Sequence, residues 1–164
     1  MSHKAMMSSS SASALTVYTL GRFAVYRGDT LIEDSAWQRQ KVKRLFKLLL
    51  LAPQRQLLKE QVLEFLWPDK TPKAALNNLH RTLFILRRVL QPDLENAADS
   101  HYLLFKDDIL TLNPEAVAWV DAEEFERLIQ LGRQQNHNLD HYNGALELYS
   151  GEFLPEDLYD DWAE

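Results

Sequence analysis

The spacing of the apolar residues changes along the chain, from a pattern typical of strands to one typical of helices. Between residues 15 and 32, β-forming residues are interrupted by turn residues at Gly21 and at Gly28 and Asp29. From residue 36 to residue 51 the apolar residues recur at helical spacing, and Pro53 follows. We therefore expect short strands and then a first helix. The β-formers are Val17, Phe23, Val25, Tyr26, Leu31 and Ile32, and the apolar residues of the helix are Val42, Leu45, Phe46 and Leu49.

Two further helices are predicted, over about residues 58–66 and 72–90. The earlier one ends at Trp67 and Pro68, because a residue before proline disfavours helix. The later one begins with Thr71 as N-cap and Pro72 at the first helical position, a favourable pair. Its apolar stripe predicts that it docks firmly on a small core. The earlier helix is expected to bury Val62, Leu63, Phe65 and Leu66, and the stripe of the later one is Leu76, Leu79, Leu83, Leu86 and Leu90.

A β-hairpin and two more helices are expected after residue 90. Residues 102–112 hold two apolar runs on either side of a polar Lys-Asp-Asp tip, which predicts the hairpin. The next helix is expected to start at a capping box formed by Asp121 and Glu124 and to end at Gly132. The last covers about residues 139–149, with Gly151 closing it. Since stacked helical repeats need three or more units, we expect these two helices to open a longer, truncated array.

The charge is divided unevenly along the chain. The net charge of −6 alone argues against nucleic acid as a partner. However, residues 15–92 hold 14 Lys and Arg against 6 Asp and Glu, whereas residues 93–164 hold 3 against 18. This asymmetry favours a basic module that faces phosphates, joined to an acidic one. The alternative is a mixed surface that is merely lopsided.

Several classes of site and location are disfavoured. The chain has no cysteine, which excludes disulfides and thiolate metal sites. It has no glycine-rich phosphate loop, and its carboxylates fall on predicted exposed faces, so we expect neither a cofactor nor an enzyme. His137 and His141 are four residues apart but have no third ligand nearby in the sequence. No apolar run suits a signal peptide or a membrane span, so we expect a cytoplasmic protein, with residues 1–14 as a disordered tail.

The face of the 72–90 helix opposite its leucines has the composition of a DNA-reading surface. In the major groove Asn pairs with adenine and Arg with guanine, while Lys and Arg also neutralise phosphates. At the start of the 36–51 helix, Trp37, Arg39 and Lys41 are expected to present amides and cations to a phosphate. The alternative is a basic helix whose polar face is only solvated. The row consists of Lys73, Asn77, Arg81, Phe84 and Arg88, with Asn78 and Ile85 along one side and Arg87 bordering the leucine stripe on the other.

Phe84 and Ile85 interrupt this polar face. Two adjacent large apolar residues opposite a core leave apolar surface in water. Three explanations stay open at this point. The two side chains contact thymine methyl groups, or another domain or subunit covers them, or the domain has lost DNA binding and serves as an interaction module.

The order of these segments resembles a known bacterial family. Leu20 and Gly21, the Trp67–Asp69 helix end, the Leu86–Leu90 motif and the residues Phe153–Pro155, Asp161 and Trp162 carry the likeness. Residues 15–113 resemble an OmpR-type winged-helix domain, most of all that of the antibiotic-regulatory-protein (SARP-like) activators. Residues 114–164 resemble the start of the bacterial transcriptional activator domain. The fold class implied is α+β: a winged helix with a small antiparallel sheet, three helices and a hairpin wing, then a TPR-like helical segment.

The resemblance implies a transcription regulator that binds promoter DNA, often at direct repeats. A homodimer, or contact with a C-terminal effector domain, is implied as well. The family's base-facing and phosphate-facing surface falls on Asn77, Asn78, Arg81, Phe84, Ile85 and Arg88, and Arg87 matches its Leu-Arg motif. Where the family commonly has a small polar residue followed by Arg, this chain has Phe84 and Ile85. The alternative function is a protein–protein interaction module that docks through these two residues.

Overall fold

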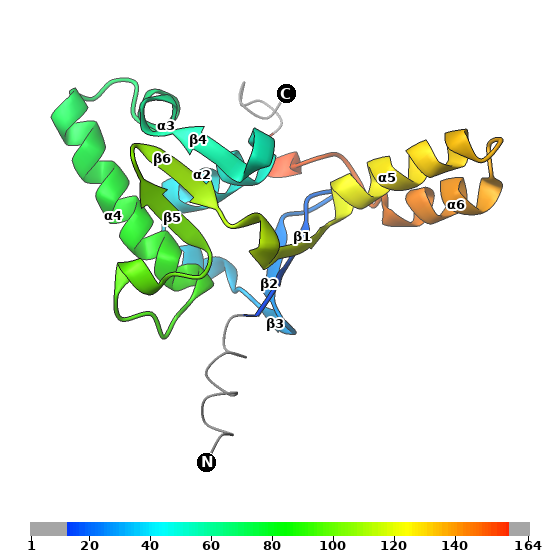
Figure 1. The fold of residues 1–164 in the computed structure, drawn as a ribbon, viewed down its shortest axis with the longest axis horizontal. Helices are drawn as coiled ribbons and strands as arrows, with labels where there is room; N and C mark the ends of the chain where they lie inside the picture. Colours follow the sequence, from blue (N-terminus) through cyan, green and yellow to red (C-terminus); the bar gives the residue numbers. More distant parts are fainter. Residues whose placement is uncertain (1–12, 158–164) are drawn as a thin grey trace, which may run out of the picture. The chain divides into compact units, whose positions relative to one another are not determined.

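A computed structural model describes residues 13–157 of the chain. The tail expected over residues 1–14 lies almost wholly outside this range, as do Asp161 and Trp162. The described residues form a mixed α+β fold with five α-helices and two small sheets (Figure 1). Contacts divide them into two compact units. The first unit comprises Ser13 and residues 32–116, and the second comprises residues 14–31 and 117–157.

The first unit contains the three helices predicted from the leucine patterns. They are α2 (Gln40–Leu51), α3 (Lys59–Leu66) and α4 (Pro72–Leu90), and the last two confirm their predicted bounds to within a residue. The first predicted helix is broken, because a 3-10 turn over Asp34–Trp37 precedes α2 and Gln38 between them has a φ of 67°. That left-handed conformation interrupts a helix, so α2 starts four residues later than predicted.

The three helices bury the apolar residues that share a face. In α2, Val42, Leu45, Phe46 and Leu49 are all fully buried, as predicted. In α3, Phe65 was wrongly assigned to the core and is 54% exposed. The buried face of α4 is rotated slightly from the leucine stripe, because Leu76 is only half-buried. The buried residues of α4 are Ala75, Leu79, Thr82, Leu83, Leu86, Val89 and Leu90.

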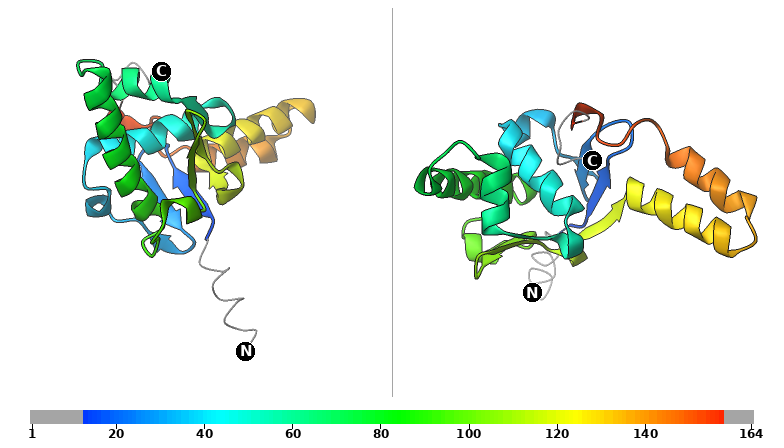
Figure 2. Two further views of the ribbon diagram at one scale, coloured as in Figure 1. Left: turned by 60° about the vertical axis from the view of Figure 1, so that its left-hand side comes forward. Right: turned by 90° about the horizontal axis from the view of Figure 1, so that it is seen from above.

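The predicted hairpin is present and belongs to a three-stranded sheet. Strands β5 (Leu103–Lys106) and β6 (Ile109–Leu112) form it, and β4 (Gln56–Leu58), which the sequence pattern did not reveal, pairs antiparallel with β6. Asp107 and Asp108 form the tip with φ values of 54° and 63°, as a tight hairpin turn requires. The tip is fixed to α3, since the Lys59 amide donates to the Asp108 carbonyl at 2.8 Å. Figure 2 shows α4 running alongside α3 and the hairpin.

The second unit combines the N-terminal strands with the chain after residue 116. Its sheet has the order β3-β2-β1-β7, formed by β1 (Leu15–Tyr18), β2 (Ala24–Arg27), β3 (Thr30–Leu31) and β7 (Val117–Val120). Strand β7 was not predicted and pairs parallel to β1. This long-range pairing groups residues 14–31 with residues 117–157, whereas the sequence placed residues 15–31 in a domain ending at 113. The boundaries 15–113 and 114–164 thus stay a prediction about family domains.

Helices α5 (Asp121–Gln134) and α6 (Leu139–Leu148) lie side by side in the second unit (Figures 1 and 2). Gly132 does not end α5. It lies within the helix, where a Cβ atom would stand 2.7 Å from Cε1 of Tyr142, so its lack of a side chain lets α6 approach. Gly151 follows α6 by three residues and packs against Gly21. The assignment of this pair to a TPR-like repeat stays a prediction.

Asp121 has a different role from the helix cap that was predicted. The N-cap of α5 is Val120, and the Asp121 carboxylate is buried, 1% exposed. Its Oδ1 accepts from the Thr19 amide at 2.7 Å and the Thr19 hydroxyl at 2.8 Å, and its Oδ2 accepts from the Leu20 amide at 2.9 Å. The carboxylate therefore joins the start of α5 to the end of β1.

None of the helices within residues 13–157 combines the length and the apolar composition needed to cross a membrane.

Replacing Asp121 by Asn is expected to destabilise the protein by about 2–4 kcal/mol. Asparagine keeps the shape but directs an N–H₂ donor at one of the amide donors, which then lacks an acceptor. Urea unfolding followed by circular dichroism measures the change. The matched control is Glu126→Gln, which removes one charge from an exposed position of the same helix and should change stability little. Equal stability of the two variants would contradict the role of Asp121.

Candidate nucleic-acid interface

The start of α4 is set by local chemistry, which fixes the side chains that face outward. The Thr71 hydroxyl accepts a hydrogen bond from the Ala74 amide at 3.2 Å, and Pro72 occupies the first helical position. With the leucines buried, Lys73, Asn77 and Arg81 are exposed. The structure therefore brings three of the predicted DNA-contacting residues to one exposed face of one helix.

Phe84 and Ile85, the two apolar residues on this face, have different surroundings. Phe84 is 57% exposed. The guanidinium of Arg88 lies over its ring, 3.9 Å from the centroid, and donates to the Phe84 carbonyl at 3.1 Å. This cation–π contact covers part of the ring and explains how an aromatic side chain is tolerated here. Ile85 is half-buried and lines a neighbouring pocket, so the two residues do not form one continuous apolar patch.

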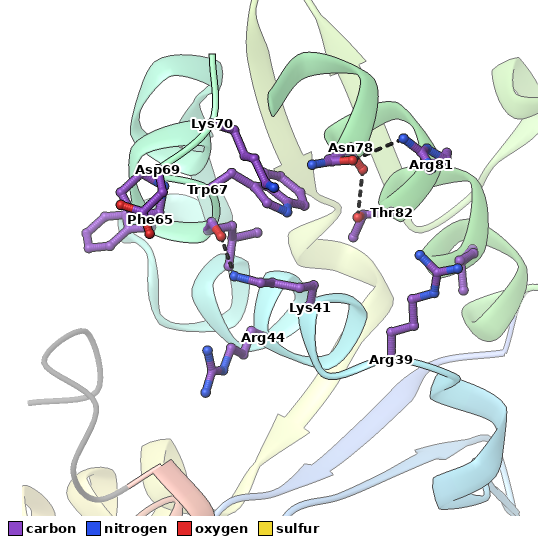
Figure 3. A pocket seen from close by; sticks show the side chains of 13 residues that line it. Arg39, Lys41, Arg44, Phe65, Trp67, Asp69, Lys70, Asn78, Arg81 and Thr82 are labelled. Carbon is purple, nitrogen blue, oxygen red and sulfur yellow. Dashed lines mark hydrogen bonds between the residues drawn. The ribbon is translucent and has the colours of Figure 1, made fainter. Parts of the chain in front are cut away.

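That pocket lies between α2, α3 and α4 and has a volume of about 610 Å³. Figure 3 shows side chains from three segments around it: the start of α2, the turn between α3 and α4, and the middle of α4. Asp69 is its single acidic lining residue, against five cations. The cations are Arg39, Lys41, Arg44, Lys70 and Arg81, and the other lining residues are Phe65, Leu66, Trp67, Pro68, Asn78, Thr82 and Ile85. Such a concentration of one sign of charge attracts anions.

Lys41 joins two of these segments. Its Nζ donates to the Leu66 carbonyl in the last turn of α3 and lies 5.9 Å from the centroid of the Trp67 ring (Figure 3). A cation at this position also interacts favourably with the C-terminal end of the helix dipole. Burial, and to a lesser extent the neighbouring Arg44, lower the pKa of Lys41. Lys41 therefore stabilises the pocket wall as well as contributing charge.

Asn78 and Arg81 are linked on the α4 side of the pocket. The Arg81 guanidinium donates to the Asn78 Oδ1 at 3.1 Å, and the Thr82 hydroxyl donates to the Asn78 carbonyl at 2.8 Å (Figure 3). The first contact orients the guanidinium before any ligand arrives. Arg81 belongs both to the exposed row of α4 and to the pocket, so these two features form one surface.

Trp37 does not belong to this surface, contrary to the prediction. The 3-10 turn places its indole in the core, 3% exposed and 5.5 Å from the Phe46 ring centroid. Arg87 borders the surface and is half-buried. Within residues 13–157 its Nε has no hydrogen-bond partner, and burial, followed by Arg88, lowers its pKa. Arg44 and Lys70 were missed as site residues, although Arg44 lies one helical turn after Lys41 and Lys70 directly before the Thr71 cap.

The hairpin tip, and the metal-ligand candidates His137 and His141, form no cluster of cations like that of the pocket beside α4. Asp107 and Asp108 place carboxylates at the tip, and Asp108 lies 3.4 Å from the Lys59 ammonium. Because carboxylates repel phosphates, the tip is poorly suited to contact a nucleic-acid backbone. His137 pairs with the Tyr142 hydroxyl, and His141 pairs with Gln135, both at 2.9 Å. The part of the chain that the structure describes holds no group of three residues able to ligate a metal ion.

Comparison with known proteins supplies a match in fold. No family model and no curated protein sequence matches the chain. The fold is similar to that of EmbR from Mycobacterium tuberculosis. That protein was solved in complex with a low-affinity phosphopeptide, and the match has a TM-score of 0.68 and 18% sequence identity. It covers 87% of this chain but 38% of that one, so the chain spans less than half the length of EmbR. At this identity the likeness concerns the fold, and function has to be argued from the surface.

Replacing Lys41 by Met is expected to destabilise the protein by about 1–2 kcal/mol, because the Leu66 carbonyl loses its donor while the apolar stem is kept. Thermal unfolding followed by circular dichroism measures the loss. The control, Lys73→Met, removes an exposed cation of α4 and should leave the unfolding midpoint almost unchanged. If both variants unfold like the wild type, the Lys41 contact does not stabilise the pocket wall.

Proposed function

We propose that residues 15–113 form a winged-helix domain that binds double-stranded DNA through the helices of the first unit, and that the protein is a sequence-specific transcription regulator. In this proposal α4 is the recognition helix and enters the major groove, and the 102–112 hairpin is the wing. The observation that carries the proposal is the continuous basic surface formed by the exposed row of α4 and the adjoining pocket. The fold likeness to EmbR is compatible with this architecture.

The side chains of this surface divide into base-reading and phosphate-binding groups. Asn77 and Arg81 are exposed near the middle of α4 and have the bidentate geometry that reads adenine and guanine. Lys73, Arg88 and the cations at the pocket rim suit phosphates, which fix position rather than sequence. Phe84, between Asn77 and Arg88 on the exposed row, is suited to a thymine methyl group. Asn78, Ile85 and Arg87 flank this row, and Arg39 and Lys41 bind phosphate from the start of α2.

The acidic tip of the hairpin limits how the wing acts. Asp107 and Asp108 repel a nearby phosphate, so the wing supports the core through β6 more than it holds DNA. Affinity must then come from α4 and the pocket rim. We further propose that the target is promoter DNA, with two copies of the protein on direct repeats, and that the protein acts in the cytoplasm without a cofactor.

One observation favours a second function, that of a protein–protein interaction module. Phe84 is more than half exposed, as a docking residue is. However, the Arg88 guanidinium covers part of its ring and Ile85 turns towards the pocket. Because Phe84 and Ile85 do not form one continuous apolar patch, they are a poor centre for a protein interface. DNA binding is therefore the better-supported proposal.

The proposal is tested by fluorescence anisotropy with duplexes taken from the region upstream of the protein's own gene. Binding is expected to weaken steeply as salt rises, because each neutralised phosphate releases counterions. Arg81→Ala should weaken binding about tenfold or more and relax the choice of sequence. Arg88→Ala should weaken binding to all duplexes and lower the salt dependence.

Arg133→Ala is the matched control, because it removes an exposed arginine from α5 in the second unit. It should leave DNA affinity unchanged. The proposal fails if the wild type shows no salt-dependent binding to any duplex, or if Arg133→Ala weakens binding as much as Arg81→Ala does.

A further inference from the structure

The pocket beside α4 has a size and a lining that the binding of a DNA backbone does not require. Its volume of about 610 Å³ falls within the range of small-molecule sites, about 300–1,000 Å³. A single backbone phosphate needs a cation and an amide at the surface of the protein. This hollow instead combines a cluster of cations with apolar and aromatic side chains.

The cations reach the pocket from three separate segments. Arg39 comes from the start of α2, Lys70 from the turn after α3, and Arg81 from α4 (Figure 3). None of the ion pairs described within residues 13–157 includes Arg39 or Lys70. Bringing like charges together around one hollow costs free energy, which the single carboxylate of Asp69 offsets in part and a bound anion would lower further. The lowered pKa of Lys41, caused by burial and then by Arg44, is consistent with this crowding.

Apolar and aromatic residues also line the pocket. Ile85 is half-buried on the α4 side, and Phe65, wrongly expected in the core, is 54% exposed at the end of α3. Trp67 and Pro68 line the pocket as well. Apolar side chains among cations match a molecule that carries both phosphate and a ring.

We infer that this pocket binds a small phosphorylated organic molecule of nucleotide size. Arg39, Lys70 and Arg81 hold its phosphate groups, and Ile85, Phe65 and Pro68 contact its ring. Since Arg81 also belongs to the DNA-facing row of α4, an occupied pocket competes with DNA. That last consequence rests on the proposed function, whereas binding of the small molecule does not.

Isothermal titration of the full chain with ADP, in the absence of DNA, tests the binding. We expect saturable binding at a single site, weakened about tenfold by Arg39→Ala and by Lys70→Ala, since each loses a charge-assisted hydrogen bond. Lys73→Ala, which removes an exposed cation of α4 outside the pocket, should bind ADP like the wild type. Circular dichroism of each variant establishes that it is folded, and Lys70→Glu provides a second substitution at an exposed position.

Adenosine and inorganic pyrophosphate separate the contribution of the cations from that of the apolar side chains. Adenosine should bind far more weakly than ADP because it lacks phosphate, and pyrophosphate should bind more weakly because it lacks a ring. The inference is overturned if ADP does not bind, if Lys73→Ala weakens binding as much as Lys70→Ala does, or if pyrophosphate binds as tightly as ADP.

A competition experiment distinguishes this inference from the proposed function. If ADP releases a bound duplex from the wild type but not from Lys70→Glu, both stand. Binding of ADP without binding of any duplex supports the pocket and refutes the DNA proposal. Binding of duplex without binding of ADP refutes the pocket as a small-molecule site and leaves its cations as backbone contacts.

Discussion

The packing of α4 against α2 determines which side chains of α4 reach solvent. Leu79, Leu83, Leu86 and Leu90 are buried almost completely, and removing any one of them would leave a cavity that costs about 2–5 kcal/mol. This burial holds the helix in one rotation about its own axis. A rotation by a single residue position would turn Arg81 away from the outer face and bring a leucine into water. The basic row is therefore a consequence of the leucine core beneath it.

The same packing creates the pocket and concentrates its charge. Once α4 is seated on α2, the start of α2 and the turn after α3 lie at its side, each with a cation. The Lys41 ammonium then donates a hydrogen bond to the Leu66 carbonyl at the end of α3. This contact lowers the electrostatic free energy of bringing Lys41 close to the other cations. Of the other cations in the lining, Arg39, Lys70 and Arg81 share it with a single carboxylate, that of Asp69. A surface that is held in place by a packed core but carries an excess of one sign of charge is typical of a binding site.

Local signals predicted most of the first unit, whereas long-range contacts escaped prediction. Thr71, Pro72 and the leucine spacing place α4 correctly because capping and helical periodicity act within a few residues. Strand β7 and the Asp121 carboxylate depend on partners about a hundred positions away, at Leu15 and Thr19, which no local pattern reveals. Among candidate site residues, the row of α4 followed from periodicity. The burial of Trp37 and the convergence of Lys70 with Arg39 depend on tertiary packing.

Amide chemical-shift mapping gives a residue-by-residue test of the proposed binding of double-stranded DNA by the outer face of α4. The isotopically labelled full chain is titrated with a duplex from upstream of its own gene, and shifted amides are assigned to residues. If α4 binds the duplex, the shifts are concentrated in α4 from Lys73 to Arg88, at the start of α2 and in the turn at Lys70, with α5 and α6 unchanged. Shifts confined to α5 and α6, or none at all at low salt, would contradict it.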